Sequence, residues 1–177
     1  MMKLPIPTSF GRLRPWSPGD APALAKYANN RKVWLNLRDL FPHPYTLEHA
    51  RAFLEMAAGR NPPTVLAIAT AEEAIGSIGL SPNQDVHRLT AEMGYWLAEP
   101  YWGKGIMSEA VARCADYGFE TFGLLRIYAE PYAHNGASCR VLEKAGFALE
   151  GRLRSSVIKD GQILDQFMYA KVIRPGA

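Results

Sequence analysis

The sequence lacks several features that would point to a secreted or membrane-bound protein. It has only two cysteines, Cys114 and Cys139, and they form no Cys-x-x-Cys pair. No apolar run approaches the ~20 residues that span a bilayer, and the N-terminus carries no apolar signal segment. Buried free thiols in a reducing compartment are the simplest interpretation of the cysteines. We therefore expect a cytoplasmic protein without a membrane partner.

Local concentrations of charge are also missing. The net charge is +3, from 20 basic and 17 acidic residues, and no run of five or more basic residues occurs. This balance does not call for a nucleic-acid partner, although it tolerates an anionic ligand. The histidines share no ligand spacing with one another or with a cysteine, so we expect no metal. They are His43, His49, His87 and His134.

The length of 177 residues fits one domain, 1–177, and 48% hydrophobic and 21% charged residues are ordinary for a globular protein. Periodicity and turn residues predict an α/β architecture with helices on a mixed sheet. The expected elements are a strand at 10–16, helices at 18–29, 31–39 and 47–59, strands at 64–71, 74–80 and 90–98, a helix at 105–122, a strand at 124–130, a helix at 135–145, and strands at 147–158 and 162–173.

The most informative stretch runs from residue 95 to residue 110, YWLAEPYWGKGIMSEA. It predicts an aromatic strand, a short glycine loop and the start of a long amphipathic helix. Gly103 and Gly105 allow a positive φ and a close approach of the backbone to a ligand. The first N–H groups of a helix lack intrahelical partners and lie at the positive end of its dipole. The segment can therefore bind a phosphate or pyrophosphate, although an ordinary strand-to-helix turn explains the same residues.

Two other phosphate-binding motifs fit this stretch less well. Ser108 stands where a dinucleotide-binding Gly-x-Gly-x-x-Gly, counted from Gly103, would have its third glycine. A P-loop of the form Gly-x-x-x-x-Gly-Lys-[Ser/Thr] does not occur in the chain.

Three ordered blocks of the sequence resemble the GCN5-related N-acetyltransferases, the GNAT family. Within that family they resemble the branch that includes the ribosomal-protein alanine N-acetyltransferases. The blocks are AEMGYWL at 91–97, YWGKG at 101–105 with Glu109-Ala110, and NGASCRVLEKAGF at 135–147 with Glu150-Gly151. The agreement extends from about residue 10 to residue 173. It implies a mixed, mostly antiparallel sheet of about seven strands, splayed in the middle, with helices on both faces.

The resemblance implies acetyl-CoA as a co-substrate. Its pyrophosphate would lie on backbone amides of residues 103–108, and its pantetheine arm would pair like a strand with the edge near Leu97. Asn135 would bind pantetheine or activate a water, although N-capping of a helix explains it equally well. Arg140 could meet the phosphates, although a solvated helix face is the alternative. The predicted donor-site residues are Trp96, Leu97, Trp102, Gly103, Lys104, Gly105, Ile106, Met107, Ser108, Asn135 and Arg140.

Two positions depart from the family pattern. Pro100 stands where the loop usually carries Arg or Gln, so backbone amides would have to hold the phosphates. Leu142 stands where many relatives keep a tyrosine as general acid, and it cannot donate a proton. Ser138 is the remaining hydroxyl of this block and the residue that this branch is thought to use. A small polar residue in the first turn of a helix nevertheless needs no special reason.

Acetyl transfer to an amine also needs a base, because an ammonium has no lone pair with which to attack the thioester. Glu92 is our candidate because it falls on the strand that leads to the splayed edge. A salt-bridged carboxylate on a half-buried strand is the alternative. The oxyanion needs a donor, which we expect to be a backbone N–H at the end of the 96–97 segment. Trp34, Phe41 and Tyr45 could line the acceptor cleft or could simply pack.

These residues predict an N-acetyltransferase that acts by direct attack of a primary amine, with Glu92, Ser138 and Asn135 as catalytic residues. The branch indicates a protein N-terminal amine as the acceptor. A small amine, such as a polyamine or an antibiotic, and a non-catalytic acyl-CoA-binding module are the alternatives. An RNA- or ribosome-binding protein would need a basic patch that the sequence does not display. A monomer and a homodimer are both compatible with the sequence.

Overall fold

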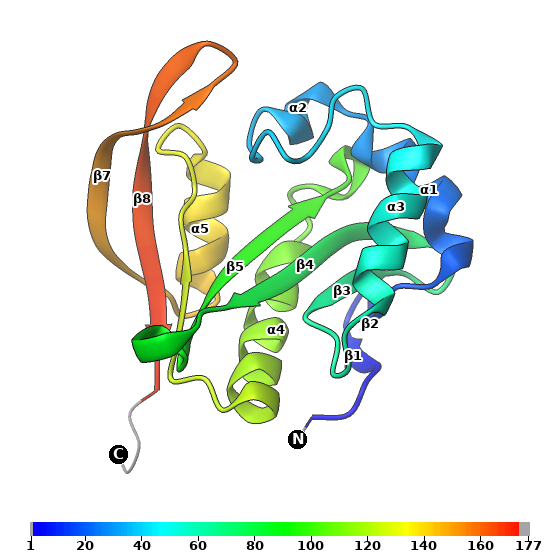
Figure 1. The fold of residues 1–177 in the computed structure, drawn as a ribbon, viewed down its shortest axis with the longest axis horizontal. Coiled ribbons are helices and arrows are strands. Elements are labelled where there is room, and N and C mark those ends of the chain that lie inside the picture. The colour runs from blue at the N-terminus through cyan, green and yellow to red at the C-terminus, as the bar shows by residue number, and fades with distance from the viewer. Residues whose placement is uncertain (1, 174–177) are drawn as a thin grey trace.

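The computed structural model describes residues 2–173, which form one eight-stranded sheet with helices on both faces (Figure 1). The strand order is β1-β2-β3-β4-β5-β6-β8-β7. Neighbouring strands are antiparallel except β5 and β6, which are parallel. The strands are β1 (Ile6–Thr8), β2 (Gly11–Pro15), β3 (Val65–Ala69), β4 (Ala74–Pro82), β5 (Thr90–Leu97), β6 (Arg126–Ala129), β7 (Ala148–Lys159) and β8 (Gln162–Val172).

The helices follow the predicted order closely. The α-helices are α1 (Ala21–Ala28), α2 (Arg31–Trp34), α3 (Leu47–Ala58), α4 (Ile106–Phe122) and α5 (Gly136–Lys144), and short 3-10 helices cover Pro18–Asp20, Asp85–His87 and Glu99–Tyr101. None of the described helices is long and apolar enough to cross a bilayer.

Two predictions from the sequence need correction. The sheet has one strand more than the seven expected, because Ile6–Thr8 pairs with β2. Pro7 obscures this strand in the sequence, yet a residue without an N–H is tolerated at the edge of a sheet. The helix expected over 31–39 ends at Trp34, and Asn36 and Leu37 continue as single turns, with N–H groups bonded three residues back.

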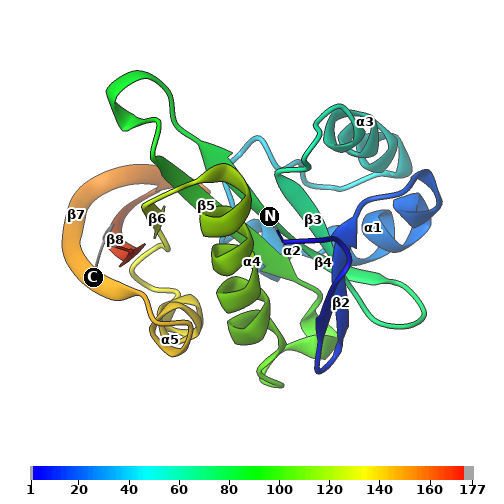
Figure 2. The ribbon, with the colours of Figure 1, turned by 90° about the horizontal axis from the view of Figure 1, so that it is seen from below.

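Side chains that alternate along the strands divide the interior into two cores. On β3, Leu66 and Ile68 pack with helices α4 and α5, whereas Ala67 between them packs with α1 and α3. Figure 2 shows α4 and α5 on one side of the sheet and α1 and α3 on the other. The sheet therefore has a helix-α4 face and a helix-α1 face, and any opening through it connects the two.

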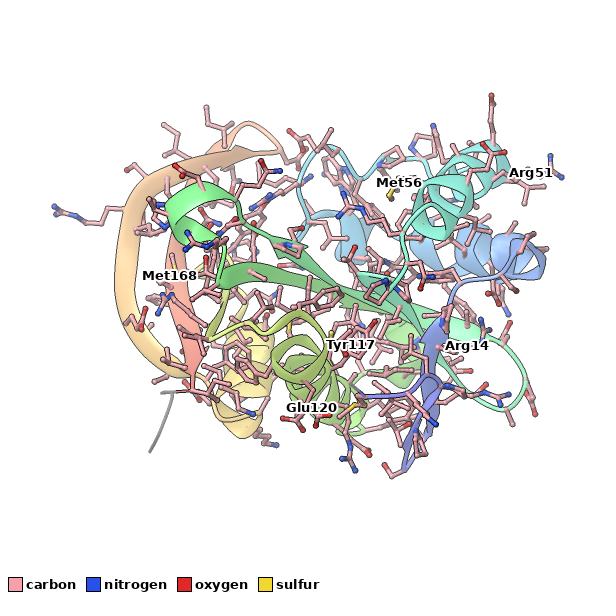
Figure 3. All side chains as sticks on the ribbon, turned by 60° about the horizontal axis from the view of Figure 1, so that its bottom comes forward. Arg14, Arg51, Met56, Tyr117, Glu120 and Met168 are labelled. Atoms are coloured by element: carbon pink, nitrogen blue, oxygen red, sulfur yellow. The ribbon has the colours of Figure 1, made fainter. Side chains whose placement is uncertain are left out.

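Helix α4 is held tightly against the sheet. Tyr117 is 1% exposed and lies on its inner side, while the exposed Glu120 lies on its outer side (Figure 3). A Cβ on Gly118 would lie 2.7 Å from Leu80 Cδ1 and 2.9 Å from Ile127 Cδ1, so a glycine lets the helix approach this closely. The second half of α4 consequently lies close against β4 and β6.

Candidate active site

Strands β5 and β6 separate part of the way along their length. Their pairing ends at Glu92 and Tyr128, although β5 continues to Leu97. The gap forms part of a cleft of about 740 Å³. Its walls come from the segment after α2, the second half of β5, the 101–108 loop, the residues after β6 and helix α5. The splayed sheet implied by the resemblance is therefore present.

The backbone of β5 offers hydrogen-bonding groups to this gap. Ala98 donates its N–H to the carbonyl of Ile75 at 2.8 Å, which fixes the alternation along β5. The N–H groups of Tyr95 and Leu97 therefore point away from β4 and toward the gap. The Leu97 carbonyl accepts a hydrogen bond from the Trp102 indole at 2.7 Å. This contact ties the 101–108 loop to the end of β5.

The glycine loop has the geometry expected of an anion site. Gly103 and Gly105 have φ values of 75° and 78°, in the left-handed region that favours glycine. Gly105 is the N-cap of α4. The first N–H of the helix that is hydrogen-bonded within it is that of Glu109, which donates to the Gly105 carbonyl at 3.2 Å. Within residues 2–173, no acceptor is recorded for the backbone N–H groups of residues 103–108. We call these residues the anion cradle.

Strand β5 and helix α5 each contribute one hydroxyl group to a pair on the helix-α4 face of the gap. The hydroxyl of Tyr95 lies 2.7 Å from Ser138 Oγ. Asn135 caps the helix, since its Oδ1 accepts the Ser138 N–H at 3.1 Å. Burial raises the pKa of Tyr95, with the Ser138 hydrogen bond acting in the opposite direction, so the phenol stays protonated. Sequence reasoning did not assign Tyr95 a role, although alternation along β5 puts it on the same face as Leu97.

Carboxylates lie on the opposite face of the gap. Glu92 precedes Tyr95 by three residues, so its side chain projects from the other side of β5. Its Oε1 lies 2.5 Å from a guanidinium nitrogen of Arg38, which comes from the segment after α2. Glu130 follows β6, and burial and the charge of Glu92 raise its pKa, while Arg38 acts in the opposite direction. Glu92 therefore forms a salt bridge, as its structural interpretation requires, and also lines the cleft, where a base would have to lie.

The cleft brings the predicted site residues together. Its lining includes all of the predicted catalytic and donor-site residues: Glu92, Trp96, Leu97, Trp102, Gly103, Lys104, Gly105, Ile106, Met107, Ser108, Asn135, Ser138 and Arg140. Phe41 and Tyr45 also line it, but Trp34 does not and instead stacks on His43 with ring centroids 5.5 Å apart. Reasoning from the sequence assigned no role to Arg38, Glu130 or Tyr95, which also line the cleft. No local motif marks Arg38, because it comes from a distant loop. The described residues contain no group of three or more His, Cys, Asp or Glu that could hold a metal ion.

Comparisons with known proteins agree with this geometry. Residues 12–148 match the family model of the acetyltransferase (GNAT) domain. The chain is 31% identical over 163 residues to the uncharacterized N-acetyltransferase p20 of Bacillus licheniformis, covering 88% of each chain. It is 38% identical over 104 residues to the uncharacterized N-acetyltransferase YoaA of Bacillus subtilis, covering 59% of this chain and 58% of that relative. The chain therefore belongs to the GNAT family of acetyl-CoA-dependent N-acetyltransferases, as the sequence blocks predict.

Solved structures show the same fold. A RimL ribosomal L7/L12 α-N-protein acetyltransferase in complex with coenzyme A superposes with a TM-score of 0.83 at 23% identity, covering 94% of this chain and 96% of that one. A GNAT-family acetyltransferase from Bacillus anthracis gives a TM-score of 0.78 at 24% identity, covering 91% and 93%. The predicted GNAT fold is confirmed.

Proposed function

We propose that this protein transfers an acetyl group from acetyl-CoA directly to a primary amine, and that the amine is the N-terminal α-amine of a protein. One observation carries the proposal: the opening between β5 and β6 has the anion cradle and the Tyr95–Ser138 pair on one face and Glu92 on the other. Donor and acceptor can thus meet from opposite sides of the sheet. The ribosomal-protein-serine acetyltransferase of Escherichia coli, 31% identical over 102 residues, supports a protein acceptor.

In this proposal the donor is held mainly by backbone groups. The anion cradle binds the pyrophosphate with N–H groups at the positive end of α4. The pantetheine arm pairs with the free edge of β5 at Tyr95 and Leu97. Trp102 and Asn135 line the channel, and Arg140 and Lys104 lie exposed at its mouth, where phosphates are solvated. Trp96 instead lies on the same face of β5 as Glu92 and packs against Phe41, with ring centroids 5.9 Å apart.

The chemistry then needs one base, one oxyanion donor and one acid. Glu92 takes a proton from the acceptor ammonium, and the amine nitrogen attacks the thioester carbonyl carbon. A β5 backbone N–H, such as that of Leu97, stabilises the oxyanion. The carbon–sulfur bond breaks, and the departing thiolate takes a proton from Ser138, which Tyr95 supports. The attacking nitrogen loses its second proton to water, from which the Tyr95–Ser138 pair regains the proton that it gave to the thiolate.

Buried thiols are poorly suited to an acyl-enzyme route. Burial raises the pKa of Cys114 to about 12, and it also raises that of Cys139. A thiolate nucleophile is therefore disfavoured at both positions. Because both cysteines are free and buried, we also propose a reducing, cytoplasmic location.

Gln166 of β8 lines the same cleft as residues from the first half of the chain, so we propose that residues 1–177 act as one domain.

The proposal is tested by thiol release from acetyl-CoA with a panel of amines. The panel holds peptides with free N-termini, the same peptides with blocked N-termini, polyamines and aminoglycosides. Turnover that requires a free peptide N-terminus is the expected result. Turnover only with polyamines or aminoglycosides would replace the acceptor, and acetyl-CoA binding without turnover for any amine would favour a binding module.

A further inference from the structure

Residues 36–39, which we call the strap, cross the helix-α1 face of the cleft and are tied to the C-terminal half of the chain. Asn36 Oδ1 lies 3.1 Å from His134 Nε2. The carbonyl of Leu37 accepts a hydrogen bond from the Tyr132 hydroxyl at 3.2 Å. Both partners belong to the segment between β6 and α5, so the strap bridges the two sides of the splayed sheet.

The tip of the β7–β8 hairpin fastens the other end of the strap. Lys159 is only 2% exposed, and its Nζ lies 2.7 Å from Asp39 Oδ1 and 3.7 Å from the centre of the Trp34 ring. The neighbouring Asp160 pairs with Arg31 at 2.6 Å. Figure 1 shows the hairpin tip curving over toward α2. The Lys159 ammonium is buried whereas the Asp39 side chain is 73% exposed, so breaking the contact would leave a buried cation without its carboxylate partner.

Three contacts thus hold residues 36, 37 and 39 of the strap. Arg38, which lies between Leu37 and Asp39, lines the cleft. Arg38 donates to Glu92, and within residues 2–173 no other acceptor is recorded for its guanidinium. A guanidinium has five N–H donors in a planar fork, so most of them stay available to a ligand beside Glu92.

We propose that Arg38 is a specificity-determining residue of the acceptor site, which recognises the first carbonyl oxygen of a peptide whose α-amine lies at Glu92, and that Lys159 positions it through Asp39. This inference rests on the proposed function. In an aminoacyl unit the α-nitrogen and the carbonyl oxygen are about 3 Å apart. The α-nitrogen and the carbonyl oxygen can therefore bind side by side to the Glu92 carboxylate and the Arg38 guanidinium, which are themselves in contact. The cation also disfavours a second ammonium at this place, as a polyamine would bring.

The experiment compares two acceptors that differ in one oxygen. The first is the best tripeptide amide from the panel, and the second is the same compound with its first peptide bond replaced by a trans-alkene, which keeps the shape and removes the carbonyl oxygen. For the wild-type enzyme we expect kcat/KM to fall about 10- to 100-fold on this replacement, as for loss of a charge-assisted hydrogen bond. In Arg38→Met the two acceptors should become equal within about threefold. In Lys159→Met the selectivity should fall at least threefold, with acetyl-CoA affinity unchanged.

Arg126→Met provides the matched control, because Arg126 pairs with Glu150 outside the cleft. It should keep the wild-type selectivity. Retention of full selectivity in Arg38→Met would overturn the role of Arg38, while continued thiol release would leave the proposed function standing. Full selectivity in Lys159→Met alone would overturn the positioning role. Absence of thiol release from the wild-type enzyme with every amine would instead count against the proposed function. Arg38 is 64% exposed, so its loss should not unfold the chain.

Discussion

The hydroxyl of Tyr95 lies 2.7 Å from that of Ser138, joining strand β5 to the first turn of helix α5 beside the opening in the sheet. A serine hydroxyl alone is a poor acid toward a thiolate. A protonated phenol that donates to it can supply a second proton as the first one leaves. The pair can thus replace the tyrosine that many relatives carry at the position of Leu142.

Tyr95→Phe should lower kcat by about 10²-fold or more, in the range of general acid catalysis, and should leave the Kd of acetyl-CoA unchanged. Steady-state kinetics and calorimetry check both quantities. Tyr169→Phe is the matched control, because this buried phenol donates to Glu143 at 2.9 Å away from the cleft. It should cost about 1 kcal/mol of stability and little activity. Equal kcat values for the two variants would remove Tyr95 from the chemistry.

Gly105→Val should raise the KM for acetyl-CoA at least tenfold, because a side chain would enter the anion cradle. It should also destabilise the fold by about 1–2 kcal/mol, since φ is positive at this residue. Gly123 has a φ of 64° at the other end of α4, and a Cβ there also meets nothing within 4 Å. Gly123→Val should therefore lose similar stability and keep the wild-type KM. An increase in KM shared by both variants would make the effect one of helix strain.

Glu92→Gln should lower kcat by about 10²-fold or more, with acetyl-CoA binding retained. Glu150→Gln is the control, because this carboxylate is also ion-paired to an arginine but lies outside the cleft. Exposed pairs of this kind contribute at most about 1 kcal/mol, and we expect unchanged kinetics. A wild-type kcat in Glu92→Gln would show that Glu92 is not the base.

Glu130→Gln should change stability in a pH-dependent way. The pKa of Glu130 is raised in the folded protein by burial and by Glu92, so between the unfolded and folded pKa values the folded state binds more protons. Stability contributed by this group is therefore lost as pH rises through that window. Urea unfolding should show the variant more stable than wild type at pH 7 and equal to it below the unfolded pKa. A stability difference independent of pH would contradict this assignment.

Most of the fold could be predicted from the sequence, because its signals are local. Thr46, for example, accepts the His49 N–H at 3.2 Å as a helix cap, and Asp160-Gly161 forms the predicted turn with φ values of 52° and 75°. Strand β1 was not predicted because Pro7 contradicts strand propensity, and the strand is stabilised by tertiary contacts: its pairing with β2 and the burial of Ile6 in the core.

In the candidate site, the local geometry of the glycine loop could be predicted from the sequence, but the contact between Arg38 and Glu92 could not. The anion cradle is contiguous in sequence, and its glycines reveal the backbone geometry. Arg38 and Glu92 are 54 residues apart in the chain and meet only through tertiary structure. Neither the Lys159–Asp39 ion pair nor the effect of Glu92 on the pKa of Glu130 leaves a local pattern in the sequence. Periodicity therefore cannot identify the residues that we propose select the acceptor.

Backbone amide NMR during an acetyl-CoA titration tests the central claim most directly, because it observes the proposed phosphate donors themselves. We predict large, saturable shifts of the amide signals of residues 103–108, together with those of Tyr95 and Leu97 on the open edge of β5. Saturation of the protein with acetyl-CoA while these amides keep their free-state positions would contradict the account.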